Sequence, residues 1–304
     1  MSFASDAKRE LCKALPAGTC CQTALAYGML LFARSFSPLG ISLTTENRAV
    51  SELFVRQIAS MGYMVDTAAA LVRKKGKNAL FTVSVPDEDQ RIRLLQCFGH
   101  TGSELNLRIN RANLENECCV SAFLRGAFLT CGTVTDPNKD YHLEFAVPHH
   151  KLARDLATLL SEAEGMRLEP GMVNRKGAYV VYLKGSESIT DLLAFLGANN
   201  AAMDLMQVKM LKEVRNYVNR TTNFQTANIS KTASAAARHL EAIQRIQEKQ
   251  GLDSLPEELR ELAKLRLEYP EMSLRELGEA LSEPISRSGV NHRLNRLIEL
   301  AEDC

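Results

Sequence analysis

One segment of this chain occurs twice, and the repeat constrains the fold more than any other feature. Cys20-Cys21 and Gly28 recur as Cys118-Cys119 and Gly126 at a single offset of 98 residues. A period this long indicates two copies of a globular unit and not a solenoid or a propeller. Each repeated segment is predicted to be a helix, in which a central glycine costs about 1 kcal/mol relative to alanine. We therefore expect the two glycines to let the two helix backbones approach closely.

Each copy of the repeat is predicted to be αββαββα-like, and three of the four strands are assigned residue ranges. In the first copy we expect helices over 19–34, 46–61 and 87–98, and strands over 41–45, 64–73 and 79–85. In the second copy we expect helices over 119–131, 148–164 and 187–196, and strands over 141–147, 166–173 and 178–183. Lys74, Lys75 and Lys77 are predicted to lie in a hairpin turn, as are Arg175 and Lys176 in the second copy. These turns are either solvated or in contact with phosphates at the rims of the saddle. Two antiparallel half-sheets should together form one saddle.

The chain beyond the second copy is predicted to be helical. A helix is expected from Asn199 to Tyr217 and another over 233–249, separated by an Asn-rich polar segment over 216–231. That segment is either a linker that contacts phosphates or a capped connection between domains. The predicted fold class is α+β, a duplicated saddle followed by an all-α domain. The predicted boundaries are 1–100 and 101–200 for the two halves, 201–232 for the helix and linker, and 233–304 for the helical domain.

Charge is segregated along the chain, although its sum is small. The net charge of +1 gives no global argument for nucleic-acid binding, so any such argument must be local. Residues 205–231 contain five basic side chains against one acid, and residues 284–297 contain three arginines and no acid. These two segments are the candidates for contact with an anionic partner.

The cysteines and the N-terminus point to a cytoplasmic protein. The eight cysteines form no C-x-x-C motif and lie at no ligand spacing from a histidine pair, so we expect reduced thiols, no structural metal and no cofactor. The start of the chain lacks the apolar core of a signal peptide. The longest apolar run, residues 24–33, is too short to span a bilayer, and we expect no membrane partner.

A helix-turn-helix is predicted near the C-terminus. Ser254 with Glu257, and Ser273 with Glu276, have the spacing of capping boxes and predict two helix starts. A short amphipathic helix over 273–281, a turn of about four residues over 282–285 and a second helix over 286–298 follow the pattern that sets a recognition helix into the DNA major groove.

The second helix of this motif has one apolar face and one polar face. Its predicted inward residues are Val290, Leu294, Leu297 and Ala301. We expect Ser286 to cap the helix and its free amides to meet a phosphate. The outward residues predicted to contact base edges and phosphates are Arg287, Ser288, Asn291, His292 and Asn295, flanked by Arg293 and Arg296 at the DNA backbone. The alternative is a helical bundle whose polar face is merely solvated.

The two repeated helices resemble the LAGLIDADG motif of homing endonucleases. In that family one acid from each helix holds the metal ions that activate water. Counting from Gly28 and Gly126, the corresponding positions hold Ala33 and Cys131, neither of which is an oxygen ligand for Mg²⁺. The resemblance therefore implies the fold without the nuclease chemistry. Arg34 stands where the motif's terminal glycine is expected, which changes the turn that follows.

Across the whole chain the sequence resembles one bacterial family, WhiA. The phrases that carry the resemblance are Tyr141–Phe145, Tyr179–Lys184, Arg215–Thr232, Gly251–Pro256 and Pro284–Leu294. The resemblance implies a nucleoid-associated regulator of sporulation and cell division that is not an enzyme and binds double-stranded promoter DNA. It also implies RNA polymerase or another transcription factor as a protein partner. The alternatives are a metal-dependent DNA endonuclease with acids from elsewhere in the saddle, and a saddle that serves as a protein-interaction platform.

Overall fold

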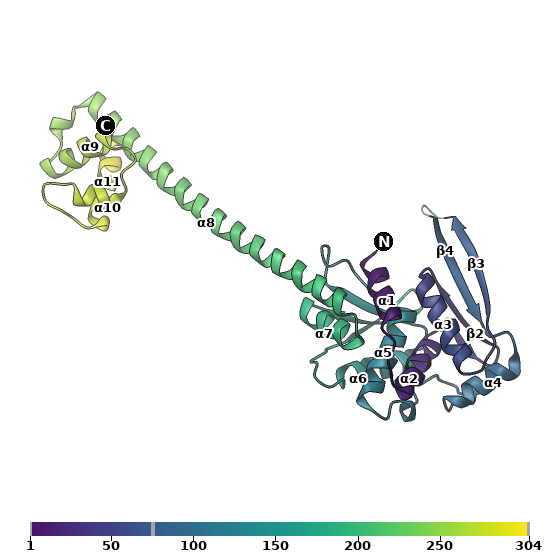
Figure 1. The fold of residues 1–304 in the computed structure, drawn as a ribbon. Coiled ribbons are helices and arrows are strands. Elements are labelled where there is room, and N and C mark those ends of the chain that lie inside the picture. The colour runs from purple at the N-terminus through teal and green to yellow at the C-terminus, as the bar shows by residue number, and fades with distance from the viewer. Residues whose placement is uncertain (1, 74–76, 303–304) are drawn as a thin grey trace. The chain divides into compact units, whose positions relative to one another are not determined.

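The computed structural model describes residues 2–73 and 77–302, which form two compact units (Figure 1). The first unit covers residues 1–212 and the second covers residues 213–304. The predicted hairpin turn of Lys74 and Lys75 lies outside the described residues. No helix in the described part of the chain has the length and apolar character needed to cross a membrane.

The first unit contains two copies of the predicted order αββαββα, preceded by α1 (Phe3–Lys13). The first copy consists of α2 (Thr19–Leu31), β1 (Ser35–Ser37), β2 (Gly40–Thr45), α3 (Arg48–Ser60), β3 (Asp66–Arg73), β4 (Lys77–Ser84) and α4 (Glu88–Cys97). After a short 3-10 turn, η1 (Arg111–Asn113), the second copy consists of α5 (Glu117–Cys131), β5 (Gly132–Val134), β6 (His142–Val147), α6 (His150–Ser161), β7 (Gly171–Arg175), β8 (Ala178–Lys184) and α7 (Ser186–Leu196). The duplicated α+β architecture is confirmed.

Each copy forms its own four-stranded antiparallel sheet. The strand orders are β1-β2-β4-β3 and β5-β6-β8-β7, so the two sheets have the same topology. Burial alternates along β2 and β6, where inward positions such as Leu43 and Phe145 are buried. Both sheets contribute to one hydrophobic core that also includes α2 and α5. The repeat is therefore one domain built from two equivalent halves.

Helices α2 and α5 pack against each other at the centre of this domain (Figure 1). A Cβ atom added to Gly28 would overlap the carbonyl oxygen of Phe123 on α5. A Cβ atom added to Gly126 would lie 2.7 Å from the backbone nitrogen of Met29 on α2. The expected close approach of the two backbones is therefore confirmed. A side chain at either glycine would collide with the backbone of the other helix.

The second unit is helical throughout its described residues. It contains the C-terminal part of α8 (Asn199–Lys249), then η2 (Leu252–Ser254), α9 (Glu257–Glu268), α10 (Leu274–Glu279) and α11 (Arg287–Glu302). Its core is a separate cluster to which α8 contributes Ile243 and Ile246, α9 contributes Leu262, and α11 contributes Leu294. The all-α character of this domain is confirmed.

Helix α8 differs from the sequence prediction, because the polar segment over 216–231 is helical. Two helices separated by a linker were expected, and a single helix of 51 residues is observed. The segment contains asparagine and threonine, which are weak helix formers, but no glycine or proline between residues 199 and 249 interrupts it. The hydroxyl of Thr232 donates to the carbonyl of Asn228 at 2.9 Å, which satisfies this polar side chain within the helix.

Three smaller predictions also need correction. Ser254 does not form a capping box; its hydroxyl donates to the carbonyl of Gly251 at 2.7 Å, and Pro256 precedes the first residue of α9. The strand predicted over 166–173 is β7, which begins only at Gly171, because Pro170 has no amide hydrogen to donate to a neighbouring strand. The short strands β1 and β5, which extend each helix of the repeat into a sheet, were not named from the sequence.

Gly28→Ala tests the packing of the central helices. In an isolated helix this change would stabilise by up to about 1 kcal/mol. Here the added methyl group meets a backbone oxygen that cannot rotate away, so we expect a net destabilisation of about 1–3 kcal/mol. Hydrogen exchange of peptides from α2 and α5 in the full-length protein measures the change. Gly40→Ala is the control, because its Cβ atom would make an ordinary contact of 3.5 Å with Ser35; equal exchange in both variants would contradict the argument.

Candidate nucleic-acid interface

Helices α10 and α11 and the turn between them form a helix-turn-helix. The predicted capping box starts α10: the hydroxyl of Ser273 accepts from the amide of Glu276 at 3.3 Å, and the Glu276 carboxylate accepts from the amide of Ser273 at 2.7 Å. Both contacts satisfy amides that a helix leaves without partners. The beginning of α10 therefore follows from local sequence, as predicted.

A close contact at Gly278 determines how the chain turns from α10 into α11. The amide of Ile285 donates to the carbonyl of Gly278 at 3.0 Å. A Cβ atom on residue 278 would overlap the carbonyl oxygen of Ile285. From α9, the Glu261 carboxylate accepts from both the amide and the hydroxyl of Ser282, at 2.6 and 2.9 Å. These contacts hold the turn against both neighbouring helices.

Helix α11 buries the face that the sequence predicted. Val290, Leu294, Leu297 and Ala301 are all buried in the core of this unit. The predicted cap is also confirmed, since the hydroxyl of Ser286 accepts from the amide of Gly289 at 3.3 Å. Ser286 also shares a hydrogen bond of 2.9 Å with Ser288. The helix is therefore held by one apolar face, and its opposite face is left to solvent.

Seven of the eight predicted contact residues lie on that exposed face. They are Ser286, Arg287, Ser288, Asn291, His292, Asn295 and Arg296. Arg293 differs from them: its guanidinium forms an ion pair with Glu258 of α9 at 2.7 Å, and its side chain is only 21% exposed. Arg296 lies 3.2 Å from Glu299 in the same helix but remains well exposed. The structure thus separates Arg293, which links α11 to α9, from the solvent-facing set.

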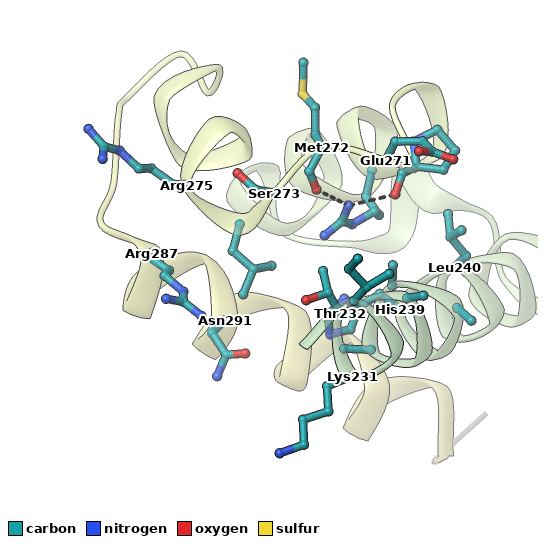
Figure 2. Close-up of a pocket in the computed structure, with 18 of the residues that line it drawn as sticks. Lys231, Thr232, His239, Leu240, Glu271, Met272, Ser273, Arg275, Arg287 and Asn291 are labelled. Atoms are coloured by element: carbon teal, nitrogen blue, oxygen red, sulfur yellow. Dashed lines mark hydrogen bonds between the residues drawn. The ribbon is translucent and has the colours of Figure 1, made fainter. Parts of the chain in front are cut away.

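The N-terminal part of α11 lines a groove of about 970 Å³ within the second unit. Figure 2 shows Arg287 and Asn291 of α11 together with Arg275 of α10 and Lys231 of α8. These four side chains come from three helices, and the only labelled acid among the lining residues is Glu271. The sequence placed Lys231 in a basic segment but did not link it to α11, and it did not single out Arg275.

Two buried polar side chains lie behind this groove. Arg266 donates from Nη1 to the carbonyls of Pro270 and Met272 at 3.1 and 2.7 Å (Figure 2), and so holds the connection between α9 and α10. His239 is also buried, and desolvation, together with the positive charges of Arg266 and Arg238, lowers its pKa to about 4. His239 is therefore a neutral core residue near neutral pH and not a contact for phosphate.

The pKa of His239 predicts a pH dependence of stability. In the unfolded chain this imidazole titrates near 6.5, so as the pH falls the unfolded state takes up a proton before the folded state does. The stabilising contribution is complete above about pH 6.5 and is lost as the pH falls towards 4. Urea midpoints measured across this range should fall less for His239→Gln than for the wild type. His292→Gln, which changes an exposed histidine, should behave as the wild type; parallel curves for all three proteins would contradict the assignment.

At the C-terminal ends of the paired helices in the first unit, residues 33 and 131 are not acids. Ala33 is buried, and Cys131 is a half-buried thiol whose pKa is raised to about 12 by desolvation. Lys8 interacts with Cys131, and burial lowers the pKa of Lys8 to about 8. Among residues 2–73 and 77–302, His, Cys, Asp or Glu side chains gather at ligand spacing in one place, formed by four cysteines at the opposite ends of α2 and α5.

Two models of protein families match the chain. The WhiA LAGLIDADG-like domain matches residues 120–215, and the WhiA C-terminal HTH domain matches residues 218–301. Full-length DUF199/WhiA from Thermotoga maritima has a similar crystal structure, with a TM-score of 0.61, 25% sequence identity, and coverage of 100% of this chain and 99% of that one.

Curated relatives match over the same length. A probable cell division protein WhiA from Caldicellulosiruptor saccharolyticus is 37% identical, covering 100% of this chain and 95% of the relative. A protein of the same name from Alkaliphilus metalliredigens is 36% identical, covering 99% and 98%. The fold and the site define a class of protein in which a LAGLIDADG-like double domain is joined to a C-terminal helix-turn-helix. Within that class, the chain belongs to the WhiA family.

Proposed function

We propose that this protein is a sequence-specific DNA-binding transcription regulator. The observation that carries the proposal is the exposed face of α11, where Arg287, Asn291 and Arg296 project from a helix that is held rigidly by its opposite face. Arginine and asparagine match the hydrogen-bonding edges of guanine and adenine in the major groove. The first turn of α11 includes no acid, so no carboxylate of that turn opposes an approaching phosphate.

Within this proposal the exposed residues have different roles. Arg287, Ser288, Asn291, His292 and Asn295 contact base edges, and Ser286 with the free amides of the helix start contacts a phosphate. Arg296 contacts the DNA backbone. Arg293 orients α11 through its ion pair with Glu258, which revises the phosphate role expected from the sequence. Lys231 adds positive charge on the side of Arg287 that lines the groove, whereas the charge of Arg275 is offset by its ion pair with Glu279 at 2.9 Å.

The names of the relatives support a cellular role. Both curated relatives described above are named probable cell division proteins. We infer that this chain regulates genes of cell division and sporulation at promoter sites, as a nucleoid-associated protein of the cytoplasm that works with RNA polymerase or another transcription factor. The first unit, in this proposal, is a nuclease scaffold without catalytic acids.

Substitutions on α11 separate base readout from phosphate contact. Arg287→Ala or Asn291→Ala removes a base contact worth about 1–3 kcal/mol, so the affinity for the specific site should fall about 5- to 150-fold while the affinity for random DNA changes little. Arg296→Ala removes a phosphate contact, so both affinities should fall together and the salt dependence should weaken by about one ion. Fluorescence anisotropy at several salt concentrations measures both effects, on a site first selected from genomic fragments.

The three variants serve as controls for one another, because each changes one exposed side chain of the same helix. Equal losses on specific and random DNA for Arg287→Ala and Asn291→Ala would contradict base readout by α11. Unchanged binding in all three variants would show that the polar face of α11 is exposed to solvent and does not contact DNA.

The absence of acids at residues 33 and 131 predicts that the protein does not cleave DNA. Supercoiled plasmid incubated with stoichiometric protein and Mg²⁺ or Mn²⁺ should remain intact, because neither alanine nor a protonated thiol binds these ions. Nicking or linearisation that depends on the metal and increases with protein concentration would favour the endonuclease alternative.

A further inference from the structure

Four thiols that are distant in sequence meet at one end of the paired helices. The Sγ atoms of Cys20, Cys21, Cys118 and Cys119 all lie within 4.8 Å of one another. Within the first pair, Sγ of Cys20 lies 3.9 Å from Sγ of Cys21. Each copy of the repeat contributes one exposed and one buried cysteine, so the cluster has the same twofold character as the helix pair.

The spacing of these sulfur atoms fits a single metal ion. Zinc binds thiolates at about 2.3 Å in a tetrahedron, which separates neighbouring sulfur atoms by about 3.8 Å. Four thiolates are a soft ligand set that favours zinc over magnesium or calcium. Iron–sulfur clusters distribute their thiolates over different iron atoms with sulfide between them, and so need a wider arrangement than this one.

The electrostatic surroundings also favour bound thiolates. Cys20 and Cys21 lie in the first turn of α2, and Cys118 and Cys119 lie in the first turn of α5. Neither helix start has a side-chain cap, since Gly18 and Asn116 form no such hydrogen bond. The positive ends of two helix dipoles therefore face the cluster, where they offset the negative charge that four thiolates leave around a divalent ion.

The two inner thiols, Cys21 and Cys119, are buried, whereas Cys20 and Cys118 are exposed. Coordination would replace each S–H bond by a metal–sulfur bond and release the proton to solvent, so metal binding should become tighter as the pH rises.

We propose that Cys20, Cys21, Cys118 and Cys119 bind one structural Zn²⁺ ion that joins the two halves of the duplicated domain. This site lies outside the DNA-binding unit and is independent of its proposed function. It reverses the expectation of no metal that was drawn from the sequence. That expectation rested on the lack of a C-x-x-C motif, whereas the ligands here are two adjacent pairs separated by 98 residues and brought together by packing at Gly28 and Gly126.

Metal analysis of the full-length protein tests the proposal. Protein purified under reducing conditions, saturated with zinc and then desalted should contain one zinc per chain by plasma mass spectrometry. Cys118→Ser, and the double variant Cys20→Ser with Cys118→Ser, should lower the zinc affinity more than about 100-fold, since changes to outer residues alone cost 10- to 100-fold. Cys97→Ser is the matched control, because Cys97 is also exposed but lies at the end of α4, outside the cluster.

A second measurement does not depend on the variants folding. Wild-type protein in which Co²⁺ replaces zinc should show the intense visible absorption of tetrahedral thiolate coordination, and one equivalent of zinc should remove it. The proposal is overturned if reduced wild-type protein retains no zinc, if it retains iron in place of zinc, or if Cys118→Ser and Cys97→Ser retain equal amounts. Disulfides across the helix pair in protein kept under reducing conditions would also overturn it, in favour of a redox site.

Discussion

The first unit depends on one contact, the approach of the α2 backbone to the α5 backbone at Gly28 and Gly126. Two helices with ordinary side chains at these positions could not pack this closely, because the added atoms would occupy the space of the Phe123 carbonyl or the Met29 amide. The two sheets continue from the ends of these helices through β1 and β5. The position of each half therefore follows from this contact between glycines.

The two ends of this helix pair carry different kinds of side chain. At the C-terminal ends, Ala33 is buried and apolar and Cys131 is a half-buried thiol with a raised pKa, so neither side chain offers an oxygen ligand to a hard metal ion. At the N-terminal ends, two pairs of cysteines meet where two helix dipoles converge. Residues 33 and 131 thus offer no oxygen ligand at one end of the helix pair, while four thiols gather at the other end.

In the second unit, contacts that hold the helix-turn-helix leave the polar face of α11 exposed. Gly278 allows α10 to meet Ile285, and Glu261 holds the turn from α9. Arg266 is buried but hydrogen-bonded to two backbone carbonyls, which ties the α9–α10 connection to the core. Arg287 and Asn291 take no part in these contacts, and both side chains are exposed.

The sequence by itself determined the features that depend on local spacing. The repeat of 98 residues, the central glycines, the capping box of Ser273 and the buried face of α11 were all predicted, since each follows from residues close in the chain or from exact duplication. Only the tertiary structure decided the features that need distant segments to meet. The cluster of four thiols, the pairing of Arg293 with Glu258 and the approach of Lys231 to the groove of α11 are contacts of this kind. The continuity of helix α8 was only partly predictable from the sequence. The weak helix propensities over 216–231 did not show whether the helix would end or continue there.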